Sequence, residues 1–187
     1  MGSIVTAASD TASALRENVH LSQLNQDKVP VLYPRGTPSG KAEEEYIASL
    51  TIQANAAAKS LACGSILAGQ SSEADEYGDV AFWLGEGDYG VGHESQVLEA
   101  LRLEGQLNAE TKVIHMDLSS ETQLPSTLRL PSLTEETKAL IELLSQLRDV
   151  HCFRIENMSG SNGLVAYVLL GQRGHGWVGL LGIGVWT

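Results

Sequence analysis

The chain has little of what would cross-link a small protein or carry it through a membrane. Two cysteines, Cys63 and Cys152, occur in 187 residues, so at most one disulfide could form. No uncharged apolar run reaches the roughly 18 residues that a membrane-spanning helix needs. Residues 1–6 lack the basic segment and the apolar core of a secretory signal. We therefore predict a cytoplasmic protein with no transmembrane segment and with both thiols reduced.

Positive charge is also scarce. Twelve Lys and Arg residues stand against 23 Asp and Glu residues, which gives a formal net charge of −11. Nucleic-acid binding needs clustered basic residues that neutralise phosphates, and here the basic residues are scattered singly. The composition therefore excludes nucleic acid as an expected partner. A weak link to membranes stays open, because the first six residues match the myristoylation pattern at Gly2, although a pattern this short also arises by chance.

The chain divides by composition into an arm and a domain. Residues 1–40 are rich in Ser, Thr and Ala and contain Pro30, Pro34 and Pro38, which disfavour a helix and favour extended or turn conformations. We expect a flexible or extended N-terminal arm there. Residues 41–187 carry helical and strand patterns throughout, and their length suits a single α/β domain that buries a core of its own.

Hydrophobic periodicity predicts an alternating order of elements in this domain. Apolar residues at helical spacing favour helices over residues 41–63, 93–104 and 132–147, and the last begins with a capping box, Ser132 to Glu135. Short apolar runs favour strands over residues 79–84, 112–118, 151–156, 164–170 and 177–186. The order predicts an α/β (α+β) fold with a mixed five-stranded sheet and helices packed on it. It contains a parallel β-α-β unit, then a helix and a C-terminal antiparallel three-strand meander.

A glycine-rich loop is the sharpest local motif. Gly85, Gly87 and Gly90 form a G-x-G-x-x-G pattern between a predicted strand and a predicted helix, and Asp117 ends the next predicted strand. Over residues 79–117 this arrangement resembles the first half of a Rossmann-like unit that binds nucleotides or S-adenosylmethionine. The resemblance implies that the three glycines approach the cofactor and that Asp117 binds its ribose. The alternative interpretation is a simple turn whose acids face water.

Other chemistry has weaker support in the sequence. Residues 73–94 contain seven acids and no Lys or Arg, and Asp79, Glu86, Asp88, His93 and Glu94 include the residue types that bind metals. Their spacing matches neither an EF-hand nor an H-E-x-x-H pair, so a metal site is not predicted. A solvated acidic segment or a surface that attracts a basic partner explains these residues better. No set of catalytic residues is apparent.

The last fourteen residues contain no Asp, Glu, Lys or Arg. In a strand, Trp177, Leu181 and Ile183 share one face, and Trp186 lies on the other. Such a strand is either central in its sheet or an edge strand covered by another chain. These four residues are the interface candidates. We predict a small acidic adaptor-like subunit that binds a protein partner or itself as a homo-oligomer, and the alternative is the cofactor-dependent enzyme described above.

Overall fold

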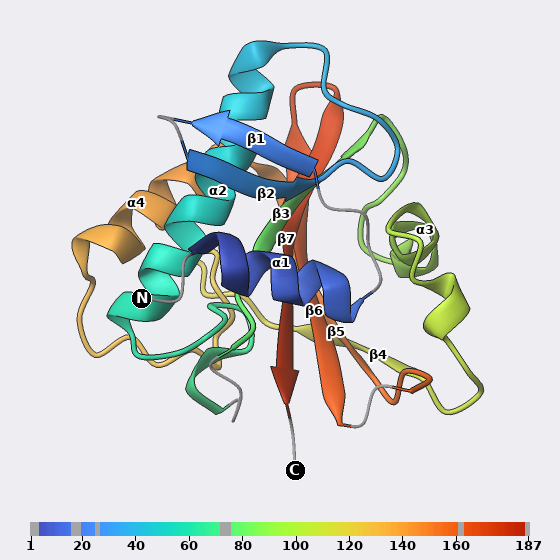
Figure 1. The fold of residues 1–187 in the computed structure, drawn as a ribbon. Helices are drawn as coiled ribbons and strands as arrows, with labels where there is room; N and C mark the ends of the chain where they lie inside the picture. The colour runs from blue at the N-terminus through green and yellow to red at the C-terminus, as the bar shows by residue number, and fades with distance from the viewer. Residues whose placement is uncertain (1–3, 16–19, 25–26, 72–75, 161–162, 186–187) are drawn as a thin grey trace.

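The structure is a computed structural model that describes residues 4–15, 20–24, 27–71, 76–160 and 163–185 (Figure 1). The described residues form four α-helices: α1 (Ile4–Ala14), α2 (Lys41–Ser60), α3 (Glu94–Ala100) and α4 (Glu135–Leu144). They also form seven strands: β1 (His20–Leu24), β2 (Asp27–Leu32), β3 (Val80–Gly85), β4 (Lys112–Met116), β5 (Arg148–Glu156), β6 (Leu164–Arg173) and β7 (Gly176–Val185). Within this described part, no helix is both long and apolar enough to cross a membrane.

One mixed sheet contains all seven strands in the order β1-β2-β3-β7-β6-β5-β4. β5, β6 and β7 pair antiparallel in sequence order, which confirms the predicted C-terminal meander and the α+β class. The sheet has two more strands than expected, because β1 and β2 lie in the N-terminal residues that were expected to form an arm. The only parallel neighbours among the described strands are β2 and β3.

The predicted β-α-β unit has its strands in the expected direction but not side by side. Each step from β3 through β7, β6 and β5 to β4 is antiparallel, so β3 and β4 point the same way. The C-terminal meander lies between them. β4 is therefore an edge strand with exposed residues, whereas β7 is central and almost wholly buried.

Helices cover both faces of the sheet (Figure 1). α2 and α4 pack on one face with Tyr167, Leu169 and Leu180, and α1 and α3 pack on the other with Phe82 and Phe153. The alternation of side chains along a strand explains why β2, β3, β5, β6 and β7 each contribute to both cores. The two apolar faces of β7 are thus covered by helices of the same chain.

Strand β2 joins the sheet through a side-chain bridge from α2. β2 and β3 share two paired positions, Val31 with Ala81 and Leu32 with Phe82. The hydroxyl of the buried Thr51 donates to the carbonyl of Pro30 at 3.0 Å and accepts from the N–H of Ala81 at 2.9 Å. Thr51 therefore completes the pairing where the strands do not bond directly.

A closed polar network lies at the start of β3. Asn55 donates to the carbonyl of Asp79 at 2.7 Å and accepts from its N–H at 3.2 Å. Ser65 and the N–H of Ile66 donate to the two carboxyl oxygens of Asp79 at 2.7 and 2.6 Å. Complete burial raises the pKa of Asp79 to about 6, although these hydrogen bonds oppose the rise. A Cβ on Gly182 would lie 2.5 Å from the Asp79 carboxyl, so the network fits only beside a glycine.

Helix α4 begins two residues later than the capping box suggested. Thr134 is the N-cap, and its hydroxyl accepts a hydrogen bond from the N–H of Thr137 at 3.1 Å. Ser132 precedes the helix on an exposed segment. The structure therefore uses the second hydroxyl residue of the segment as the cap.

Candidate functional site

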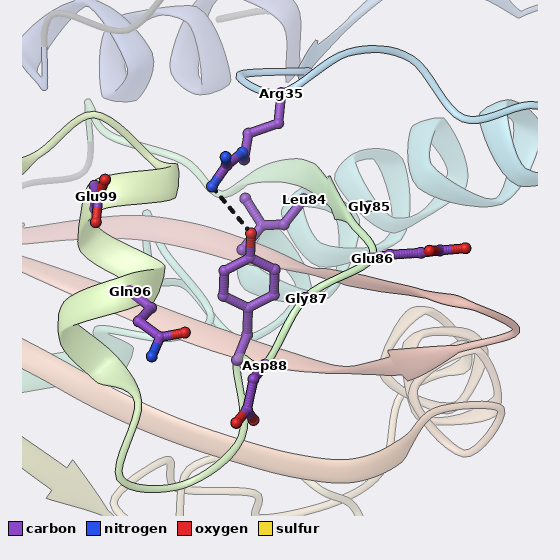
Figure 2. Close-up of a pocket in the computed structure, with 9 residues that line it drawn as sticks. Arg35, Leu84, Gly85, Glu86, Gly87, Asp88, Gln96 and Glu99 are labelled. Carbon is purple, nitrogen blue, oxygen red and sulfur yellow. Dashed lines mark hydrogen bonds between the residues drawn. The ribbon is translucent and has the colours of Figure 1, made fainter.

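The glycine-rich loop follows the carboxyl end of β3 and lines a pocket of about 490 Å³ (Figure 2). Gly85 ends the strand with a φ of +73°, a left-handed conformation that glycine adopts readily. The loop then leads into the first turn of α3. The pocket is lined by residues from the segment between β2 and α2, from β3, from the loop after it and from α3: Arg35, Leu84, Gly85, Glu86, Gly87, Asp88, Tyr89, Gln96 and Glu99.

Packing against Tyr89 explains Gly87, the second glycine of the motif. A Cβ on Gly87 would lie 2.4 Å from the ring of Tyr89, which is itself 4% exposed. The indole N–H of Trp177 donates to the carbonyl of Gly87 at 3.0 Å, and the rings of Trp177 and Tyr89 meet edge to face at 6.4 Å. A Cβ on Gly90 would meet only ordinary contacts. The close approach of Tyr89 is therefore sufficient to explain the glycine at position 87.

The charges around this pocket are mainly negative. Glu86, Asp88 and Glu99 line it, and among the described residues that line it only Arg35 has a positive charge. The guanidinium of Arg35 donates to the hydroxyl of Tyr89 at 3.3 Å (Figure 2). Glu86 points away from Gln96 and Glu99, toward the other side of the loop (Figure 2). Such a lining disfavours a pyrophosphate and favours a cation.

A second hollow of about 440 Å³ adjoins the first and shares Gly85 and Glu86 with it. Its wall includes Trp83, Glu43 and Arg173. The guanidinium of Arg173 stacks on the ring of Tyr46 at 3.9 Å and donates to Gln146 at 2.8 Å. We call the two hollows together the acidic groove. Its carboxylates are those of Glu43, Glu86, Asp88 and Glu99.

Asp117 lies far from the glycine-rich loop. It follows β4, and β7, β6 and β5 separate that strand from β3. With strands about 4.8 Å apart, four steps across the sheet amount to about 19 Å. The predicted set of Gly85, Gly87, Gly90 and Asp117 is therefore not brought together, because the C-terminal meander lies between the two strands that carry it.

The interface candidates lie in the interior. Trp177 is 6% exposed, and Leu181 and Ile183 are fully buried against the α1 and α3 side of the sheet. Because β7 is central, the alternative of an edge strand covered by another chain does not apply to it. Trp186 lies outside the described residues.

The residues considered for a metal are separated in the structure. Asp79 lies at the opposite end of β3 from Glu86 and Asp88. His93 lies 3.2 Å from Asp88, whereas Glu94 pairs with a different histidine. Among the residues that the structure describes, no group of three or more His, Cys, Asp or Glu side chains is placed to bind a metal ion.

A cluster that sequence reasoning missed lies beside the loop, formed by Glu94, His115 and His151. One carboxyl oxygen of Glu94 accepts from the N–H of Gly92 at 2.8 Å and lies 3.3 Å from Nε2 of His115. His151 packs edge to face on Trp177 at 6.0 Å. We call these three residues the Glu94–histidine cluster, and they come from α3, β4 and β5.

A β-bulge at the start of β5 fixes the position of His151. The register of β5 shifts between Arg148 and His151, and Asp149 adopts a φ of +52°. Nδ1 of His151 lies 3.3 Å from the carbonyl of Asp149, which places the proton of the neutral ring on Nδ1. Its Nε2 is buried and has no hydrogen-bond partner among the described residues. Bulges often re-aim a side chain beside a functional site.

The surroundings of Glu94 and His151 lower the pKa values of both residues. Partial burial acts to raise the pKa of Glu94, but hydrogen bonds from the Gly92 and Glu94 N–H groups, together with electrostatic attraction to His115 and His151, lower it overall. Burial lowers the pKa of His151, against the opposing effects of Asp149 and Glu94. At neutral pH the cluster therefore contains a carboxylate beside an uncharged buried imidazole.

No protein-family model matches this chain, and no curated protein is similar to it. The functional conclusion therefore rests on the geometry of the groove and the cluster. Both lie at the edge of the sheet where β3 and β4 end, which is where ligands bind in many open α/β sheets. Pairing in the sheet could reveal His115 and His151 as neighbours, because His115 lies opposite Phe153, two residues from His151. That pairing is not apparent from the sequence.

Proposed function

We propose that this chain is an interaction subunit that binds a basic segment of a protein partner in the acidic groove. The observation that carries the proposal is the charge balance of the groove. Four carboxylates line it against two arginines: Arg35 bonds to Tyr89, and Arg173 donates to Gln146 and lies 3.9 Å from Glu43, so Glu86, Asp88 and Glu99 have no arginine partner in the groove among the described residues. Lysine or arginine side chains of a partner would supply the missing positive charge.

The groove is divided into two hollows, each of which could receive a basic side chain. Its two adjoining hollows of about 490 and 440 Å³ meet at Gly85 and Glu86. Trp83 contributes an aromatic wall to one hollow, and aromatic faces attract guanidinium and ammonium groups. A segment with two basic side chains could place one in each hollow.

A second copy of the chain fits the groove less well. The twelve basic residues of the sequence are scattered singly, so the chain offers no basic stretch of its own. The overall charge of −11 adds repulsion between copies. A different protein is therefore the proposed occupant of the groove. Light scattering on the purified chain tests for self-association.

The proposal is tested by titrating the protein with a fluorescent peptide of alternating arginine and glycine residues. We expect binding that weakens from about 0.05 M to about 0.5 M salt, since opposite charges on a surface are screened. An acidic peptide of equal length is the negative control. NADH and S-adenosylmethionine are titrated in parallel, and binding of either in place of the peptide would favour the cofactor-dependent enzyme.

A charge-matched pair of variants separates the groove from the general charge of the protein. The variant E86Q/D88N/E99Q removes three groove carboxylates and should reduce peptide affinity by roughly tenfold or more. The variant E121Q/E136Q/E142Q removes three exposed carboxylates outside the groove and should change affinity much less. Equal losses in the two variants, or no peptide binding by the wild type, would refute the proposal.

A further inference from the structure

The loop that forms the acidic groove is attached to the protein through the Glu94–histidine cluster and its neighbour Trp177. The Gly87 carbonyl accepts from the indole N–H of Trp177 at 3.0 Å, and the Gly92 N–H donates to Glu94 at 2.8 Å. These two bonds lie on either side of Tyr89 and Gly90. His151 packs edge to face on Trp177 at 6.0 Å and interacts electrostatically with Glu94, without an ion pair between the two.

His151 is the member of the cluster with an unused hydrogen-bonding atom. Its side chain belongs to a residue that is 6% exposed, and its Nε2 has no partner among the described residues. On β5 and β7 the groups against it are the uncharged rings of Phe153 and Trp177. A proton added to Nε2 would create a buried donor and a positive charge between two aromatic rings, which is unfavourable without an acceptor.

The charged group that faces His151 from α3 is Glu94, and from β4 it is His115. In the loop before α3, His93 lies 3.2 Å from Asp88, and this pair is a separate exposed contact. Glu94 is therefore the anion available to a protonated His151. Its carboxyl oxygen already accepts from the Gly92 N–H and lies beside Nε2 of His115.

We infer that the Glu94–histidine cluster is a pH-sensitive switch for the loop, in which protonated His151 draws Glu94 away from the Gly92 N–H and loosens the groove. In mildly acidic solution the groove would then release a basic partner. The release rests on the proposed function, whereas the loosening of the loop does not. Burial lowers the pKa of His151, so the transition should come below the value of about 6.5 that an exposed histidine has.

The switch is tested first without any ligand, by following the Gly92 amide and the Trp177 indole N–H by NMR from about pH 7.5 to about pH 5. Both resonances should shift with one common midpoint, and faster amide exchange should accompany the shift. In the variant H151Q, which cannot gain a proton in this range, the transition should disappear. Resonances that do not move in the wild type, or that move equally in H151Q, would overturn the switch.

A second variant covers the case in which H151Q does not fold. E94Q removes the negative charge that a protonated His151 would attract, at a partly exposed position, so it leaves the core intact and should also abolish the common transition. H20Q changes a histidine in β1, at the opposite edge of the sheet, and should behave as the wild type.

Peptide titrations across the same range test the link to binding. The wild type should lose roughly tenfold in affinity on acidification, and H151Q should lose much less. A peptide that binds the wild type equally at both pH values would overturn the link. Failure of the peptide to bind at any pH would count against the proposed function, while the ligand-free NMR transition would still decide the switch.

Discussion

The polar groups at the two ends of β3 differ in their burial and in their hydrogen bonding. At its start, Asp79 is fully buried and bonds to Asn55, Ser65 and Ile66 of the same chain. At its end, the loop after Gly85 presents Glu86 and Asp88 to solvent around a pocket. Both ends contain carboxylates near glycines, yet only the first forms a closed network.

The difference separates a structural site from a candidate functional one. Buried polar groups are normally satisfied inside a protein, and the Asp79 network meets that requirement. The groove and the adjoining cluster leave carboxylates exposed and one buried imidazole nitrogen without a partner among the described residues. Changes at the first site should therefore alter stability, and changes at the second should alter binding.

The largest effect is expected from Gly182→Ala. The added methyl group would lie 2.5 Å from the Asp79 carboxyl and 2.6 Å from the Ser65 hydroxyl, so the network must shift. We expect a loss of about 3 kcal/mol in the free energy of unfolding, measured by urea denaturation. Gly105→Ala is the control, because its Cβ would meet no atom within 4 Å. Similar losses in both variants would contradict the crowding at Gly182.

Asn55→Ala should have the next largest effect. It removes the partner of both the N–H and the carbonyl of Asp79 and leaves these groups buried. Unsatisfied buried groups cost about 1–3 kcal/mol, so we expect a loss of about 2 kcal/mol in unfolding free energy. Lys59→Ala, an exposed change on the same helix, provides the baseline for thermal and urea unfolding. An unchanged stability would mean that the network does not support β3.

The pH dependence of stability tests the Asp79 carboxyl at the start of β3. The pKa of Asp79 is raised from 3.8 to about 6 in the folded protein, so the folded state keeps a proton that the unfolded chain releases. The Asp79 contribution to stability should be greatest below about pH 4, fall by roughly 3 kcal/mol between about pH 4 and about pH 7, and then level off. Glu94 and His151, whose pKa values are lowered, give slopes of the opposite sign.

The contribution of Asp79 is therefore read as a difference between the wild type and D79N. Urea denaturation of both proteins at a series of pH values gives that difference directly. The decrease in unfolding free energy with rising pH that is assigned to Asp79 should be present in the wild type and missing from D79N. A difference that stays constant with pH would show that Asp79 does not titrate as its burial requires.

The smallest effect on stability is expected in the loop that follows the end of β3. Glu86 is exposed, and no hydrogen bond or ion pair joins it to another described residue. Glu86→Gln should change the free energy of unfolding by less than about 0.5 kcal/mol, measured by urea denaturation. A loss as large as that of Asn55→Ala would remove the distinction between the two ends of β3.

Much of the fold follows from local patterns in the sequence. Alternation and short apolar runs predicted the strands that became β3 to β7, and the Leu140 and Leu144 spacing predicted α4. β1 and β2 were missed because Pro30 argued against regular structure. That proline lies in a strand whose connection to β3 is completed by Thr51, a residue 21 positions away. Local patterns contain no information on such a contact.

The candidate site was predicted only in part. The loop at Gly85 and its acids were identified, and the structure places them around a pocket. The structure separates this loop from Asp117, because the meander lies between β3 and β4, and sequence order does not reveal that placement. The Glu94–histidine cluster was missed, because three residues from α3, β4 and β5 become neighbours only through sheet pairing and the bulge before His151.

The sequence by itself determined the secondary-structure class, the negative charge and the apolar character of β7, since each depends on residue type and periodicity. The tertiary structure decided the roles of those features. It placed β7 at the centre of the sheet, closed the Asp79 network around Gly182, and left the acids after Gly85 around an open groove. The physical reason is that long-range pairing and packing decide which polar groups find partners inside the chain and which face a ligand.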